Sequence, residues 1–316
     1  MFRHLLVPLD GSRLAESVLP VAARLARQDN AALTIVHVIE RNAPSAVHSD
    51  RHLVSADQAA AYLEEVARRP ALEGLTVRTH VHTAEVKDVA RSITQHTEEL
   101  APDLVVMNTH GRGGARRLLF GAIAQQVISL GQTPVLLLRP NEHAEPGTPG
   151  RGSTPPLAAA PWRTILAPVD GDPAHERGLP LAADMALDFH SRLHLLMVVP
   201  TIGRLAGFQA AAAMLLPGAT RVKLEMEIAG AREYLLQRSE ELRRRGVNAT
   251  GEVTRGDPAR AIARAARRLS ADLVVMGTHG RAGTDAFWAG SVAARVVART
   301  RTPLLLVPLR EEPDAG

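Results

Sequence analysis

The sequence predicts an α/β protein built from two tandem, doubly wound domains, each a five-stranded parallel sheet with helices on both faces. Three observations lead to this prediction. Short apolar segments alternate with longer segments of helical period, as expected when parallel strands are joined by helical crossovers. Segments such as VVM and LLL are apolar at every position, which is typical of strands buried on both faces. The whole pattern also occurs twice along the chain.

The repeat is defined by three pairs of matching segments. They are HLLVPLDGS and TILAPVDGD (4–12 and 164–172), DLVVMNTHGRGG and DLVVMGTHGRAG (103–114 and 272–283), and TPVLLLRP and TPLLLVPL (133–140 and 302–309). Residues 141–161, between the copies, are rich in Pro, Gly, Ser and Ala, which is the composition of a linker. We therefore expect one domain at 1–140 and a second at 162–310, joined by a linker at 141–161.

Within each copy the elements follow from apolar runs and from helical periodicity. Strands are expected in the first copy at 4–9, 33–39, 75–81, 103–108 and 134–138, and in the second at 163–169, 193–199, 247–253, 272–277 and 303–307. Helices are expected at 13–28, 56–69, 86–100 and 121–131, with counterparts in the second copy. There, Asp257 followed by Pro258 marks a helix start, because Asp caps well and Pro fits the first helical position.

The second copy is longer than the first by nine residues, since the offset between matching segments grows from 160 to 169. The extra residues fall around 201–220. Their apolar part, 205–216, is consistent with an extended helix on the sheet, which we favour, or with a lid over a site.

Composition excludes several classes of protein. The 316 residues contain no cysteine, so disulfide frameworks, cysteine–zinc sites and thiol nucleophiles are ruled out. No apolar run approaches the roughly 20 residues that span a bilayer, and the N-terminus lacks a signal-peptide pattern. We expect a cytoplasmic protein without membrane or nucleic-acid partners, because the net charge is only +4. The arginine clusters 243–245 and 267–268 are typical of solvated helix ends.

Two histidine pairs raise the question of a metal site. His48 and His52 are four residues apart, and His80 and His82 are two apart on an expected strand, so each pair could share a face. Together they could hold zinc, but no carboxylate is placed beside them by spacing. Surface or packing roles are the favoured interpretation, and we predict no metal site.

The strongest functional pattern lies where the sheet order is expected to reverse. In doubly wound folds, ligands bind there, beyond the carboxyl ends of the strands. Asp10 and Asp170 end the first strand of each copy, and a glycine-rich loop follows the fourth. In the second copy that loop reads Gly277-x2-Gly280-x9-Gly290-Ser291.

Glycines let the backbone approach a ligand closely, and the helix start at Ser291 has free N–H groups suited to an anion. Arg281 could add positive charge. The alternative is that the glycines only form turns and that Ser291 only caps a helix. The position of the loop, between a strand and a helix and beside Asp170, favours phosphate binding.

The chain resembles a tandem universal stress protein over both copies, on the segments PLDGS and PVDGD, DLVVM(N/G)THGR and TP(V/L)LL. The resemblance implies a Rossmann-like fold of the adenine nucleotide alpha hydrolase type and ATP, with or without Mg²⁺, as ligand. The nucleotide-binding branch of the family carries G-x2-G-x9-G-(S/T), which the second copy matches in full. The first copy supplies Asp10, Gly111 and Gly121 but has Asn108 and Ala122 where the pattern has Gly and Ser.

By position, the resemblance implies a role for each matching residue of the second copy. At the adenosine end, Asp170 makes contact beside Pro168 and Val169, and Val198 approaches the base. The ribose is lined by Met276 and Gly277. The phosphate loop is shaped by His279 and Gly280, and the phosphates are bound by Gly290, Ser291, Val292 and Ala293. Asn108 adds a side chain where the pattern has none, and Ala122 lacks a hydroxyl, so we expect unequal sites with the second copy the better one.

Three functions follow from these residues. The first is a stress-response or signalling protein that binds ATP without fast turnover, since the loop has no Walker lysine and no catalytic residue is identified. The second is a nucleotide-independent interaction scaffold. The third, a slow ATPase or another adenine-nucleotide enzyme such as a ligase or synthetase, is the least favoured, although slow hydrolysis or self-phosphorylation could accompany the first. Family members dimerise through the last strand, so 134–138 and 303–307 could pair within one chain as a pseudo-dimer, and a homodimer could form in addition.

Overall fold

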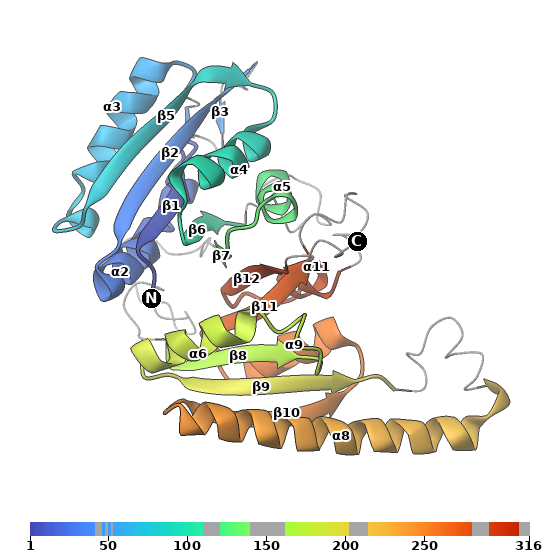
Figure 1. The fold of residues 1–316 in the computed structure, drawn as a ribbon. Coiled ribbons are helices and arrows are strands. Elements are labelled where there is room, and N and C mark those ends of the chain that lie inside the picture. The colour runs from blue at the N-terminus through green and yellow to red at the C-terminus, as the bar shows by residue number, and fades with distance from the viewer. Residues whose placement is uncertain are drawn as a thin grey trace, which may run out of the picture. The chain divides into compact units, whose positions relative to one another are not determined.

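The computed structural model describes residues 1–41, 46–47, 50–51, 53–109, 121–139, 162–201, 214–279 and 291–309. The chain divides into two compact units, and the second begins at Trp162. Each unit has a parallel sheet with helices packed on it (Figure 1). The predicted fold class is therefore confirmed.

The first unit contains a five-stranded sheet in the order β7-β6-β1-β2-β5. Its strands are β1 (His4–Pro8), β2 (Ala32–Glu40), β5 (Val77–Val86), β6 (Leu104–Asn108) and β7 (Val135–Leu138). All neighbouring pairs are parallel. Every residue of β6 and β7 is buried, as the uninterrupted apolar runs predict. A short antiparallel pair, β3 (Ala46–Val47) with β4 (Asp50–Arg51), lies outside this sheet.

The second unit repeats this arrangement in the order β10-β9-β8-β11-β12. Its strands are β8 (Thr164–Val169), β9 (Arg192–Val199), β10 (Asn248–Arg255), β11 (Leu273–His279) and β12 (Leu304–Leu309). In both units the first strand is central, and the chain adds strands on one side and then on the other. The order therefore reverses between β1 and β6 and between β8 and β11, as expected.

Helices cover the faces of each sheet. The first unit has α1 (Arg13–Glu16), α2 (Leu19–Asp29), α3 (Ala56–Ala67), the 3-10 turn η1 (Pro70–Leu72), α4 (Val89–Leu100) and α5 (Ala122–Leu130). The second has α6 (Gly178–Asp188), α8 (Pro217–Arg244), α9 (Pro258–Arg268) and α11 (Val292–Val297). The carboxylate of Asp257 caps α9 by accepting the N–H of Arg260 at 2.9 Å, which confirms the predicted helix start.

One helix that was predicted to be continuous is interrupted. The segment expected as a single helix at 13–28 consists of α1 and α2, separated at Ser17 and Val18. Pro20 cannot donate the N–H that a continuous helix would direct at the carbonyl of Glu16. Ser17 also ends α1, because its hydroxyl donates to the carbonyl of Leu14 at 2.7 Å.

The aspartate of each DLVVM segment fastens the central strand. One carboxylate oxygen of Asp103 accepts the N–H groups of Arg3 at 2.7 Å and His4 at 2.9 Å. Asp272 accepts those of Arg163 at 2.8 Å and Thr164 at 2.9 Å in the same way. Because charge-assisted hydrogen bonds are stronger than neutral ones, this aspartate fixes where the fourth strand lies beside the first.

Helix α8 of the second unit is much longer than its counterpart in the first unit. Helix α8 has 28 residues, whereas its counterpart α3 has 12. Its C-terminal part packs on the sheet through Leu235 and Leu242, while Val222 and Met226 near its N-terminus are exposed. The segment 205–216, for which an extended helix or a lid was predicted, precedes α8, and most of it (202–213) lies outside the described residues, so both alternatives stay predictions. No helix in the part of the chain that the structure describes could span a membrane.

Candidate functional site

The two central strands of the second unit separate toward their carboxyl ends. Strand β8 pairs with β9 over its whole length, from Thr164 to Val169. With β11 its register contains only Ile165 and Leu166, opposite Leu273 and Val274. Both strands then continue for several residues. The edge of the sheet at this point carries Asp170 on one side and Gly277 on the other, which is the predicted location of the site.

Asp170 lies in a turn held by its own carboxylate. One oxygen accepts the N–H of Asp172 at 3.0 Å, and the other lies 2.7 Å from Nδ1 of His175. Gly171 between them has φ of +86°, a left-handed conformation that suits glycine. The Asp170 side chain is 57% exposed, so it is accessible to a ligand from solvent.

The pairing with Asp170 predicts a pH-dependent contact. The hydrogen bond that the His175 ring donates to Asp170 raises the pKa of His175, and partial burial opposes this effect. Since the folded-state pKa is raised, the contact stabilises the turn below the ordinary pKa of about 6.5 and is lost as the pH rises through the folded-state value. Both side chains are largely exposed, so solvent screens the interaction.

An NMR titration of the histidine ring protons should give His175 a pKa above the ordinary value. The Asp170→Asn substitution should lower the pKa of His175 toward that ordinary value. His194, whose pKa is lowered by burial, serves as the internal reference with a shift of opposite sign. A wild-type His175 that titrates at or below the ordinary value would contradict the pairing.

Gly277 is required by the fold of the second unit itself. A Cβ at this position would lie 2.6 Å from the carbonyl oxygen of His175 and 3.0 Å from Cδ2 of Leu309. The turn that follows β8 therefore crosses directly over the end of β11. This contact brings the Asp170 turn and Gly277 together, as predicted. It also shows that packing requires a glycine at position 277, which the motif alone does not reveal.

Asn108 occupies the equivalent position in the first unit and makes different contacts. Its side chain is buried, and the amide nitrogen donates to the carbonyl of Leu14 and, at 2.9 Å, to the hydroxyl of Ser17. The segment after β1 is thus bonded by a side chain, whereas in the second unit a backbone carbonyl fills the same space. The replacement of Gly277 by Asn108 in the first unit therefore corresponds to a different packing of the turn that follows the first strand.

Ser291 begins helix α11 as its N-cap. Its hydroxyl oxygen accepts the N–H of Ala294 at 3.2 Å, which agrees with the alternative in which it caps the helix. A serine hydroxyl also has one O–H to donate, so the cap leaves a donor for an anion. In the first unit the cap is Gly121, without a side-chain bond, and Ala122 is the first helical residue.

The other predicted residues, including Gly111 of the first unit, fall into three groups. Pro168 and Val169 end β8, Val198 is half-buried near the end of β9, and Met276 is buried in β11. Val292 and Ala293 form the first turn of α11, where the Ala293 side chain is buried in the core. Gly280, Arg281, Gly290 and Gly111 lie outside the described residues, as does the side chain of His279, the last residue of β11.

Asp10 matches Asp170 in position and also holds a turn. One of its oxygens accepts the N–H of Ser12 at 2.9 Å and the Ser12 hydroxyl at 2.6 Å. Three residues near these turns were not predicted: His175, Glu16 and Glu176. The repeat offset of 160 pairs Glu16 with Glu176, so this signal was available in the sequence.

The histidines at 80 and 82 pack against a third histidine of α4. Nδ1 of His82 lies 3.2 Å from Nε2 of His96, whose other nitrogen lies 3.0 Å from a carboxylate oxygen of Glu99. The rings of His80 and His96 meet edge-on, with centres 4.6 Å apart. Within the described residues, no group of three or more histidines and carboxylates is arranged to hold a metal ion. His48 and His52 lie outside them.

Comparison with known proteins places both units in the same group. The universal stress protein family matches residues 1–139 and 161–308. A universal stress protein of Mycolicibacterium smegmatis is 26% identical over 322 residues, covering 96% of each chain. Universal stress protein YxiE of Bacillus subtilis is 26% identical over 151 residues, covering 44% of this chain and all of its own.

Among solved structures, a universal stress protein from Archaeoglobus fulgidus superposes with a TM-score of 0.65 at 16% identity, covering 98% of this chain and 97% of its own. At that identity the likeness concerns the fold alone. It extends over both units and their order along the chain.

Proposed function

The chain belongs to the universal stress protein family, with two such domains in tandem, and on this premise we propose that it is a stress-response or signalling protein whose second unit binds ATP. The motif of the second copy carries the proposal. Its first residue, Gly277, ends up beside the Asp170 turn, and its last, Ser291, begins the helix after the loop. Turnover is expected to be absent or slow.

The described residues fit an adenosine. The exposed carboxylate of Asp170 can accept hydrogen bonds from ribose hydroxyls or from the base. Met197 and Val198, half-buried at the end of β9, offer apolar surface for the base. The hydroxyl of Ser291 would donate to a phosphate oxygen. If Mg²⁺ accompanies the nucleotide, phosphate oxygens and water would be its ligands, and the exposed carboxylate of Asp170 could supply one more.

We expect Ser291→Ala to weaken ATP binding about fivefold or more, because one hydrogen bond to a charged phosphate is lost. The protein is first freed of bound nucleotide and then titrated with ATP by calorimetry, with and without Mg²⁺. Ser55→Ala is the matched control, since Ser55 caps α3 in the same way, accepting the N–H of Gln58 at 3.3 Å, in the unit without the motif.

Equal weakening by Ser291→Ala and Ser55→Ala would mean that lost helix capping accounts for the effect. Absence of ATP binding by the wild-type protein would refute the proposed function and favour a nucleotide-independent scaffold. Release of ADP during incubation would identify a slow ATPase.

We also propose that the two sites are unequal. Asn108 and Ala122 replace the Gly and Ser of the motif in the first unit, and the Asn108 amide is committed to the turn after β1. One bound ATP per chain is therefore expected, and two would contradict the proposal. Domain limits at 1–140 and 162–310, and pairing of the last strands of the two domains as in a family dimer, remain part of this proposal.

A further inference from the structure

Each unit uses a tyrosine to hold the glutamate that follows its first strand. The chain has two tyrosines, Tyr62 and Tyr234. Their hydroxyls donate to Glu16 and Glu176, which are related by the repeat and stand six residues after Asp10 and Asp170. Both tyrosines of the chain thus make the same contact.

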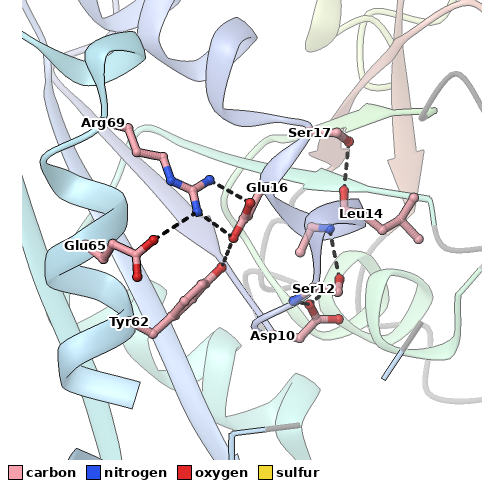
Figure 2. A network of polar contacts seen from close by, with 9 residues as sticks. Asp10, Ser12, Leu14, Glu16, Ser17, Tyr62, Glu65 and Arg69 are labelled. Atoms are coloured by element: carbon pink, nitrogen blue, oxygen red, sulfur yellow. Dashed lines mark hydrogen bonds and ion pairs between the residues drawn. The ribbon is translucent and has the colours of Figure 1, made fainter. Parts of the chain in front are cut away.

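In the first unit this contact is part of a partly buried ion pair between Glu16 and Arg69 (Figure 2). The Tyr62 hydroxyl lies 2.9 Å from one oxygen of Glu16. The guanidinium of Arg69 donates to both oxygens, at 2.6 and 3.1 Å. Only 14% of the Glu16 side chain is exposed, so the carboxylate depends on these partners to offset its desolvation.

The second unit builds the same cluster from one longer helix. Tyr234 and Arg238 both belong to α8, and the hydroxyl of Tyr234 donates to Oε2 of Glu176. A guanidinium nitrogen of Arg238 lies 3.7 Å from that oxygen, and only 4% of the Glu176 side chain is exposed. Burial, followed by the bond to Glu176, raises the pKa of Tyr234 to about 12.

The two clusters do not arise from one sequence offset. The glutamates are separated by 160 residues, the arginines by 169 and the tyrosines by 172. In the first unit Tyr62 lies within α3 and Arg69 beyond its end, whereas in the second both partners lie within α8. The tyrosines therefore occupy different helix positions, and Arg238 lies farther from its glutamate than Arg69 does, so the feature common to both units is the tyrosine–glutamate contact beside the turn that follows the first strand.

In the second unit the glutamate is bonded directly to the predicted nucleotide-binding turn. Oε1 of Glu176 accepts the N–H of Gly171 at 3.2 Å, while Oε2 accepts from Tyr234. One buried carboxylate thereby joins helix α8 to the residue that follows Asp170. Gly171 adopts φ of +86°, so this bond holds the residue of the turn that has the left-handed conformation.

We propose that Glu176 and Tyr234 are positioning residues that hold the Asp170–Asp172 turn in the conformation that binds nucleotide. The inference rests on the proposed function. Loss of the Tyr234 hydroxyl leaves Glu176 with a weaker hold on the N–H of Gly171. The turn then samples other conformations, and Asp170 is in place for a smaller fraction of the time, so the apparent affinity falls.

The test compares Tyr234→Phe with Tyr62→Phe, which removes the same hydroxyl from the other unit. Amide hydrogen exchange at Gly171, without nucleotide, should become about fivefold faster in Tyr234→Phe and stay unchanged in Tyr62→Phe, since one hydrogen bond is lost. ATP affinity should fall by a similar factor in Tyr234→Phe alone. Glu176→Gln, which keeps the shape but removes the charge, should act in the same direction.

Unchanged exchange at Gly171 in both Tyr234→Phe and Glu176→Gln would overturn the proposal. So would faster exchange with unchanged ATP affinity, or equal loss of affinity in both tyrosine variants, because either result assigns the cluster a purely structural role. If wild-type protein binds no ATP, the proposed function and the binding half of the inference fail, while the exchange measurement still decides whether Glu176 holds the turn.

Discussion

Gly277→Ala is expected to destabilise the second unit by about 3 kcal/mol or more, at the upper end of the cost of overpacking. The added methyl would lie 2.6 Å from the carbonyl oxygen of His175, which belongs to the backbone and cannot turn away like a side chain. It would also lie 3.0 Å from Leu309 on the neighbouring strand. The turn after β8 must therefore move, and Asp170 moves with it.

Chemical denaturation of the full chain measures this effect as a loss of unfolding free energy. Gly230→Ala is the matched control, because Gly230 lies in α8 and a Cβ there meets nothing within 4 Å. That change should stabilise the protein by about 0.5–1 kcal/mol, since alanine favours helices. Equal stability of Gly277→Ala and wild type would show that the turn can move aside without cost.

The strands could be predicted from the sequence because their environment is simple. Parallel strands buried on both faces are apolar at every residue, so β6 and β7 could be located within a residue or two. The edge strand β5 is less buried and extends to Val86, five residues beyond its predicted end. The break between α1 and α2 was also predictable in principle, because Pro20 marks it.

The site could be located from the sequence, but its contacts could not. The topology of the fold places Asp170 and Gly277 at one edge of the sheet, and the repeat identifies both. That His175 crosses over Gly277 depends on a contact between residues 102 positions apart, for which no local pattern exists. The contacts of Tyr62 and Tyr234 could not be predicted either, because they also join residues far apart in the sequence.

Asn108 shows that comparing a sequence with a binding motif does not reveal the structural role of a residue that differs from the motif. From the sequence, Asn108 was noted only as adding a side chain where the motif has none. In the structure the buried amide donates to Leu14 and Ser17 and so holds the turn after β1. A residue that departs from a binding motif can therefore be necessary for folding in its own unit.

Asn108→Ala is accordingly expected to destabilise the first unit by about 2–3 kcal/mol, because two buried hydrogen bonds are lost and the carbonyl of Leu14 loses a donor. A double-mutant cycle with Ser17→Ala, followed by chemical denaturation, should give a coupling energy of about 1 kcal/mol between the two side chains. A stability unchanged by Asn108→Ala would mean that the amide is replaceable by water. The residue would then differ from Gly277 without a structural cause, and the inequality of the two sites would rest on the loop and on Ala122 alone.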